Sequence, residues 1–309
     1  GWEHMDDGLD PFHFTSSIAV SPEFETDQTV YAGTNGDGLY RSVNGGSNWA
    51  QIHQGISAGF SLLGYRDIGL SPDFVNDHTM FTATQDGVFR STDTGDTWEQ
   101  QNIGIGDINL EKVMLSSRFQ IDGTLFVESF GDKIFRSTDV GETWQQLNQD
   151  PPGSFATLLG TSPTVDGISY LCIGTDTGTM RSADHGDTWQ QLSHEPYFHP
   201  IAFSPSFADD STMFGDGSDG IYRSSDGGIS WRKIGDDIVF NFAALNTSPA
   251  FNDDHLIFVG GSGGVFRTTD VIPEPSPLPS VGPWALGLLA GLLLVLGIRR
   301  SISVRTGGD

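Results

Sequence analysis

One ten-residue phrase is repeated five times along the chain, and it constrains the fold more than any other feature. Each copy reads aromatic or Met, Arg, Ser, any residue, Asp or Asn, any residue, Gly, two residues, and Trp. The copies occupy residues 40–49, 89–98, 135–144, 180–189 and 222–231. Their tryptophans are therefore 49, 46, 45 and 42 residues apart, so the chain is built from similar units of that length.

The stretches between the copies predict short strands. In the first unit, residues 17–21, 29–34, 39–42 and 49–52 each alternate or cluster apolar residues between turn-forming ones. An opening phrase resembling Ser-Pro-x-Phe recurs six times and is followed by a turn acid at Asp27, Asp77, Asp122, Asp210 and Asp254. A period of 40–50 residues with four strands per unit is typical of a β-propeller. We therefore expect an all-β propeller domain over residues 1–271.

The two ends of the repeat array predict how it closes. The sixth unit stops at Asp270, before any Gly, Trp or fourth strand. Trp2 precedes Ser21 by about the spacing that separates each internal tryptophan from the next opening serine. We expect residues 2–5 to supply the missing fourth strand by pairing with residues 265–267, which makes six blades. The alternative is a seven-bladed propeller with missing upstream residues, because the chain begins without Met and in mid-repeat.

The charge of the chain excludes one class of partner. The formal net charge is −25, and the tail from Pro273 is slightly basic, so residues 1–272 carry about −26. Such a surface repels nucleic acids and anionic headgroups and favours cations or basic partners. Cys172 is the only cysteine, so no internal disulfide can form, and its apolar surroundings in sequence predict a buried strand residue.

The repeated phrase resembles the Asp-box, or BNR repeat, of sialidases and related propellers. The resemblance implies a structural role, in which the acid binds its own turn and the tryptophan packs between sheets, away from any active centre. The positions concerned are Asn44, Asp93, Asp139, Asp184 and Asp226 for the acid, and Trp49, Trp98, Trp144, Trp189 and Trp231.

The arginines argue against sialidase activity. Sialidases, by resemblance, hold a carboxylate with three converging arginines. Here one arginine occupies the same place in every repeat, which predicts a structural role, and three more belong to the tail. Arg66, Arg118 and Arg232 remain, and they are not expected to converge at one mouth.

Xyloglucanases with these boxes, by resemblance, have two propellers and a cleft between them. A glycosidase also needs two facing carboxylates, and no pair stands out among Asp67, Asp107, Glu111, Glu195 and Asp236. We predict no enzyme activity.

A ligand is expected at the mouth opposite the boxes, in the loops 54–67, 101–112, 148–155, 193–200 and 235–241. The candidate ligand-binding residues are Tyr65, Arg66, Asp67, Glu111, Glu195, Tyr197 and His199. His194 and His199 do not have a zinc-site spacing, and no metal site is predicted. Asp209, Asp210, Asp216 and Asp219 are either ordinary turn residues or, as the alternative, ligands for calcium.

The C-terminal tail predicts the location. Residues 272–280 form a proline-rich linker, residues 281–298 are uncharged and long enough to span a bilayer, and residues 299–309 form a basic cytoplasmic tail. Pro273-Glu274-Pro275 resembles the PEP-CTERM sorting signal, and residues 278–284 resemble its IPTL-CTERM variant. The resemblance implies a cell-surface protein, secreted and anchored by its C-terminus, with the propeller outside the cytoplasm.

Together these features predict a non-catalytic surface propeller that binds an extracellular glycan or a surface protein. The alternative is a surface glycoside hydrolase, either sialidase-like or xyloglucanase-like. A third class is that of the photosystem II stability factors, which resemble this chain in their boxes. That class, by resemblance, relies on a basic patch, which a domain of this charge lacks.

Overall fold

The computed structural model describes residues 7–9, 15–34, 38–56, 65–131, 133–147, 156–175, 177–193, 201–217, 219–234, 242–247, 251, 255–261 and 264–267. The chain divides into two compact units, residues 1–269 and residues 270–309. The predicted linker 272–280, the predicted span 281–298 and the basic tail lie outside the described residues. None of the helices within the described ranges has the length and apolar character that crossing a bilayer requires.

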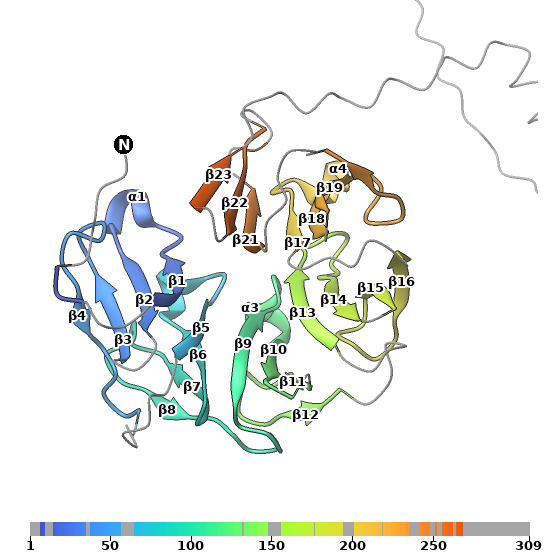
Figure 1. The fold of residues 1–309 in the computed structure, drawn as a ribbon. Coiled ribbons are helices and arrows are strands. Elements are labelled where there is room, and N and C mark those ends of the chain that lie inside the picture. The colour runs from blue at the N-terminus through green and yellow to red at the C-terminus, as the bar shows by residue number, and fades with distance from the viewer. Residues whose placement is uncertain are drawn as a thin grey trace, which may run out of the picture. The chain divides into compact units, whose positions relative to one another are not determined.

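The described part of the first unit contains six antiparallel sheets, five of four strands and one of three (Figure 1). The first two sheets are β1 Thr15–Val20, β2 Val30–Thr34, β3 Gly38–Ser42 and β4 Ala50–Gln51, then β5 Tyr65–Leu70, β6 Met80–Thr84, β7 Gly87–Ser91 and β8 Glu99–Gln100. The third and fourth are β9 Leu110–Leu115, β10 Leu125–Ser129, β11 Ile134–Ser137 and β12 Gln145–Gln146, then β13 Ala156–Thr161, β14 Leu171–Thr175, β15 Gly178–Ser182 and β16 Gln190–Ser193. The last two are β17 Ile201–Phe203, β18 Met213–Gly217, β19 Gly220–Ser224 and β20 Arg232–Lys233, then β21 Phe242–Thr247, β22 Ile257–Gly261 and β23 Gly264–Arg267.

Each sheet is a meander, because its strands pair in sequence order. The first strands of successive sheets contact one another, from β1 through β5, β9, β13 and β17 to β21. Figure 1 shows these first strands facing the middle of the unit, with β4, β8, β12 and β16 on its outside. The short four-strand units expected from the repeat are therefore present, one sheet per repeat.

The turn between the first and second strand differs from the plain turn that the sequence predicted. Among the sheets in which the structure describes this turn in full, it forms one helical turn in four, α1 Phe24–Asp27, α2 Phe74–Asp77, α3 Phe119–Asp122 and α4 Phe207–Asp210. The acid closes it, since Asp77 accepts a hydrogen bond from Ser71 Oγ at 2.7 Å and one from the Thr79 N–H at 2.9 Å. The next residue, His78 in α2, is left-handed with φ of 52°, which ends the helix.

The hydrophobic core lies between the sheets. The cluster between the second and third sheets joins Phe81 and Ala83 to Leu110, Val113 and Phe119, all buried. Phe81 meets Phe119 edge-on, with ring centroids 5.8 Å apart. Because side chains alternate across a strand, β10 packs Leu125 and Val127 against the second sheet and Phe126 against the fourth. Such positions read as continuous apolar runs in the sequence.

The box tryptophans join sheets at two junctions. Trp98 and Trp144 are buried, and their indole N–H groups donate to the carbonyl oxygens of Ile52 at 2.7 Å and Gln101 at 2.8 Å in the preceding sheet. Trp231 differs from this expectation, because its indole N–H bonds to Gly228 in its own turn at 2.9 Å and the side chain is only half-buried.

At three junctions the repeated arginine reaches from one sheet into the box turn of the next, which agrees with the structural role that the sequence predicts. Arg41 donates to the Thr94 carbonyl at 3.1 Å and lies 2.9 Å from Asp96. Arg136 contacts Asp187 at 2.7 Å, and Arg181 donates to the Gly227 carbonyl at 3.0 Å. At these three junctions the arginine side chain therefore links two neighbouring repeats.

The residues 7–9 pack on the first box as if they belonged to a preceding repeat. The Trp49 N–H donates to the Asp7 carbonyl at 2.9 Å, as the Trp98 N–H does to Gln54 at 2.9 Å and the Trp144 N–H to Ile103 at 2.8 Å. Asp7 follows Trp2 by the same number of residues that separates Gln54 from Trp49 and Ile103 from Trp98. Trp2 and the predicted strand 2–5 lie outside the described residues, and so does the predicted pairing with β23.

Candidate functional site

The strand order fixes which ends of the sheets can form a mouth. Within each meander, the turn after the first strand and the box turn after the third lie at one end. The start of the first strand and the end of the second lie at the opposite end. The predicted mouth residues that the structure describes, Tyr65, Arg66, Asp67 and Glu111, come early in first strands and so belong to this box-free end.

Four of the predicted ligand-binding residues lie in strands, which corrects their assignment to connecting loops. Tyr65, Arg66 and Asp67 begin β5, and Glu111 is the second residue of β9. A bulge between Tyr65 and Asp67 lets the pairing with β6 continue through this polar stretch, so that Tyr65 still pairs with Thr84. Glu195, Tyr197 and His199 lie outside the described residues.

Asp67 joins the second sheet to the third. One carboxylate oxygen accepts the N–H of Ile68 at 3.0 Å, and the other accepts the N–H of Val113 in β9 at 3.1 Å. Burial raises the pKa of Asp67 to about 6, against the opposing effect of these two hydrogen bonds and of Lys112. This carboxyl group can exchange a proton near neutral pH, but both of its oxygens are already engaged.

A second ionisable group at the same end was not anticipated from the sequence. Lys112 in β9 pairs directly with Glu128 in β10, with 3.8 Å between Nζ and Oε2. Thr157 in the fourth sheet donates to the same Glu128 oxygen at 3.1 Å and accepts from Lys112 at 3.2 Å. Glu128 is only 3% exposed, so its charge is compensated inside the protein.

Asp216 occupies in β18 the place that Glu128 occupies in β10, the fourth residue of the middle strand. In the other four sheets the fourth residue of the second strand is small: Gly33, Ala83, Gly174 and Gly260. Asp216 is 7% exposed, and its Oδ1 is buried without a hydrogen-bond partner. Burial raises the pKa of Asp216 to about 7.

The sequence signal for Glu128 and Asp216 was a lone acid inside an otherwise apolar or small-residue strand. A buried acid has to be paired or neutralised. Comparison of the repeats at this one position would have found both residues, whereas a search of the connecting loops did not.

The described residues contain no group of three or more His, Cys, Asp or Glu side chains able to hold a metal ion. The aspartates considered for calcium are divided between two ends of a sheet. Asp209 and Asp210 are in α4, before the strand β18, and Asp216 and Asp219 are at its far end. The strand that separates the two pairs is too long for them to share one ion.

The box acids at the opposite end bind their own turns. Asp93 accepts the Thr97 N–H at 2.9 Å and the Ser91 hydroxyl at 2.7 Å. Slight burial acts to raise the pKa of Asp93, but these hydrogen bonds outweigh it and lower the pKa below its usual value. The same pattern of hydrogen bonds lowers the pKa values of Asp139, Asp184 and Asp226. Asn44 accepts the Asn48 N–H at 2.9 Å, so the uncharged copy keeps the turn.

Comparison with known proteins rests on structure alone. No protein-family model matches the chain. No curated protein matches it by sequence. Among solved structures, an ancestral GH74 enzyme superposes with a TM-score of 0.63 at 15% identity, covering 85% of this chain and 37% of that one.

Two further structures are similar. YCF48 bound to D1 peptide has a TM-score of 0.60 at 18% identity, covering 84% of this chain and 80% of that one. The extracellular domain of the putative hybrid two-component system BT4673 from B. thetaiotaomicron has a TM-score of 0.61 at 11% identity, covering 87% and 33%. The chain thus spans about a third of the GH74 enzyme and of the BT4673 domain, and four-fifths of YCF48. These structures are β-propellers, and the likeness shows that this chain has the β-propeller fold.

Proposed function

We propose that this chain is a non-catalytic propeller that binds an extracellular glycan or a surface protein at the box-free mouth. The observation that carries the proposal is the use of the mouth's charged groups. Asp67 accepts two backbone N–H groups, and Glu128 is held by Lys112 and Thr157. Carboxylates occupied in joining sheets are poorly placed to act as the acid and the nucleophile of a glycosidase.

The comparisons support a binding role without deciding it. YCF48 is a propeller of similar length with a peptide bound, and this chain covers most of it. The GH74 enzymes are much longer, so the chain could supply only about a third of such an enzyme. A glycoside hydrolase therefore stays the second candidate.

The experiment is a glycan-array and surface-protein screen with the full chain, with and without calcium, run beside a hydrolysis assay on xyloglucan and sialylated oligosaccharides. We expect binding without turnover. The variant Asp67→Asn should weaken mouth binding only partly, and Glu99→Gln, an exposed acid in β8, serves as the charge-matched control. Turnover that Asp67→Asn abolishes and Glu99→Gln leaves intact would replace this proposal with the hydrolase.

We further propose that the ring has six blades and is closed by residues 2–5 as the fourth strand of the sheet β21–β23. The register of Asp7 on Trp49 supports this closure. We also propose that the propeller lies outside the cytoplasm, held by residues 281–298 as a membrane anchor. The apolar stretch and the PEP-CTERM-like motif support this location, and protease treatment of intact cells tests it, since an outward propeller would be cleaved.

A further inference from the structure

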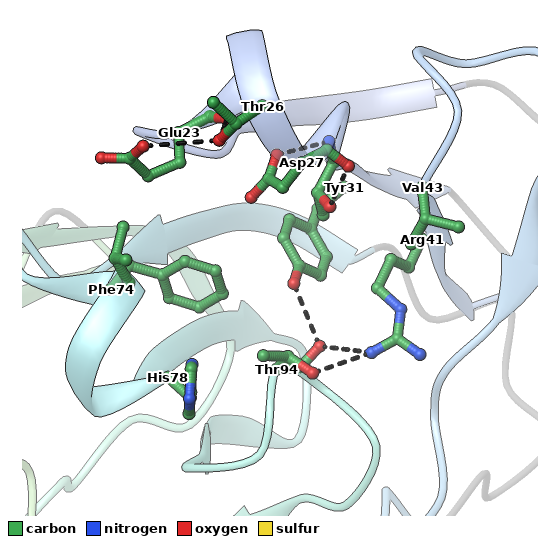
Figure 2. A pocket seen from close by; sticks show the side chains of 11 residues that line it. Glu23, Thr26, Asp27, Tyr31, Arg41, Val43, Phe74, His78 and Thr94 are labelled. Atoms are coloured by element: carbon green, nitrogen blue, oxygen red, sulfur yellow. Dashed lines mark hydrogen bonds between the residues drawn. The ribbon is translucent and has the colours of Figure 1, made fainter.

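A pocket of about 470 Å³ lies between the first and second sheets, on the box end and thus away from the mouth. Figure 2 shows its walls. Tyr31 and Phe74 form an aromatic floor, with their rings edge-on at 5.8 Å, and His78 lies beside Phe74. The exposed carboxylates of Glu23 and Asp27 belong to its lining.

The same junction is filled elsewhere in the protein. Between the second and third sheets, the turn acid Asp77 receives the side-chain amide of Gln120, which also donates to Ser71 Oγ at 2.6 Å. Between the third and fourth sheets, the turn acid Asp122 faces His185, whose Nε2 is 3.5 Å from Oδ2. In both junctions a nitrogen from the following sheet meets the turn acid of the preceding one.

At the first junction no such nitrogen is present among the described residues. Val75 occupies the place of Gln120, as the second residue of its helical turn. Thr94 occupies the place of His185 in the box, and its hydroxyl is engaged with Arg41 at 2.9 Å. From the part of the chain that the structure describes, the Asp27 carboxylate accepts hydrogen bonds from Ser21 at 2.5 Å and from the Thr29 N–H at 2.8 Å, both within its own sheet. Asp27 is exposed, and a carboxylate has room for about four hydrogen bonds; the equivalent Asp77 accepts three.

Arg41 is the one arginine or lysine in the lining, and its charge is already compensated. Arg41 lies 2.9 Å from Asp96 and donates to both oxygens of Thr94. The Glu23 carboxylate accepts one long hydrogen bond, from the Thr26 hydroxyl at 3.4 Å, so no positive side chain of the described residues pairs with either acid at the rim. A ligand could therefore neutralise both. Residues 1–272 carry about −26 charges overall, which draws basic partners towards any such opening.

We propose that this pocket, lined by Glu23, Asp27, Tyr31, Phe74 and Val75, binds a lysine or arginine side chain from the surface of a protein partner. The ammonium or guanidinium group would donate to Asp27 and Glu23, as the side-chain amide of Gln120 does to Asp77. The aliphatic stem would lie over Val75 and the aromatic floor, which suits a long side chain with a charged end.

The test uses a fluorescein-labelled peptide of repeated Gly-Ser-Lys units, its twin with every lysine Nε-acetylated, and fluorescence anisotropy with the full chain. The decisive variant is Val75→Gln, which installs the amide that fills the sister junction. It keeps the net charge, so it leaves bulk attraction to the basic peptide unchanged. We expect at least about a tenfold weaker binding in Val75→Gln and in the acetylated peptide. Equal binding by wild type and Val75→Gln would overturn the proposal.

Two further variants separate binding in the pocket from general attraction to an acidic surface. Glu23→Gln removes a charge from the pocket, and Glu25→Gln removes the same charge from an exposed position of the same turn outside the lining. We expect only Glu23→Gln to weaken binding, by about three- to tenfold. Equal loss in both variants would show general attraction and contradict the site. Tight binding of free spermidine with none of the peptide would also contradict a protein-borne side chain as the occupant.

Discussion

The backbone N–H of Trp49 donates to the carbonyl of Asp7 at 2.9 Å, and the two tryptophans that follow make the same bond to Gln54 and Ile103. The glycine after each acceptor, Gly8, Gly55 or Gly104, has a positive φ between 94° and 97°. Residues 7–9, which precede the first sheet, thus contact the first box as the segments that follow the first and second sheets contact the second and third boxes.

This relationship predicts that Gly8→Ala destabilises the propeller. A Cβ at Gly8 would lie 2.4 Å from the Trp49 carbonyl oxygen, at a φ of 94° that side chains disfavour. We expect a loss of about 1–3 kcal/mol in the free energy of unfolding, measured by urea denaturation. Gly106→Ala is the matched control, because its Cβ would have no atom within 4 Å. An unchanged midpoint for Gly8→Ala would show that residues 7–9 add nothing to the fold.

The box tryptophans are predicted to differ in importance. Trp98→Phe removes the bond to Ile52 in the preceding sheet and leaves that buried carbonyl without its donor. We expect a loss of roughly 1–3 kcal/mol in the free energy of unfolding. Trp231→Phe removes a bond within one turn, from a half-buried side chain, and should cost clearly less. Equal losses in thermal and chemical unfolding would refute a role for Trp98 in joining sheets.

The Lys112–Glu128 pair predicts a non-additive result. Lys112→Met leaves the buried Glu128 carboxylate without its counter-charge and should destabilise the protein by about 1–3 kcal/mol. Adding Glu128→Ala, the residue that the second sheet carries as Ala83, removes that uncompensated charge. The double variant should therefore be more stable than Lys112→Met alone. A double-mutant cycle measures this, and simple additivity would contradict the pairing.

The raised pKa of Asp216 leads us to expect that the stability of the protein depends on pH. Its pKa is raised to about 7 in the folded protein from an unfolded value near 4, so the folded state binds the proton more tightly. This group's contribution to stability is therefore fully present at pH 4, declines between pH 4 and 7, and is absent above pH 7. Asp216→Asn should raise the melting temperature relative to wild type at pH 8 and leave it nearly unchanged at pH 4. Parallel melting curves for the two proteins across this range would contradict the raised pKa.

The all-β meander was readable from the sequence because one residue pattern recurs at every turn. The Asp and Gly of each box act within a single turn. Because these interactions depend only on residues close in sequence, they fix the spacing of the motif. The role of Asp93 in its own turn and the positive φ of Gly95 follow directly from that spacing.

The site was harder to predict, because it depends on contacts between repeats. Nothing near Asp67 in sequence indicates that it accepts the N–H of Val113. Lys112 and Thr157 meet Glu128 only because three strands from two sheets converge. Loops were expected to carry the charged residues, whereas a bulge keeps Tyr65 and Asp67 in a strand.

The arginine contacts between neighbouring repeats have a consequence for how such a chain can change its length. Arg41, Arg136 and Arg181 each donate to the main-chain carbonyl at the same position of the next box, at Thr94, His185 and Gly227. Each of the five boxes has a main-chain carbonyl at this position. After a repeat is duplicated or deleted, its arginine would still find a matching carbonyl in the box of the next repeat. Gene rearrangement could thus change the number of repeats without requiring new contacts between them. A repeat that differs from the others, such as the one with Val75, could then acquire a separate binding function.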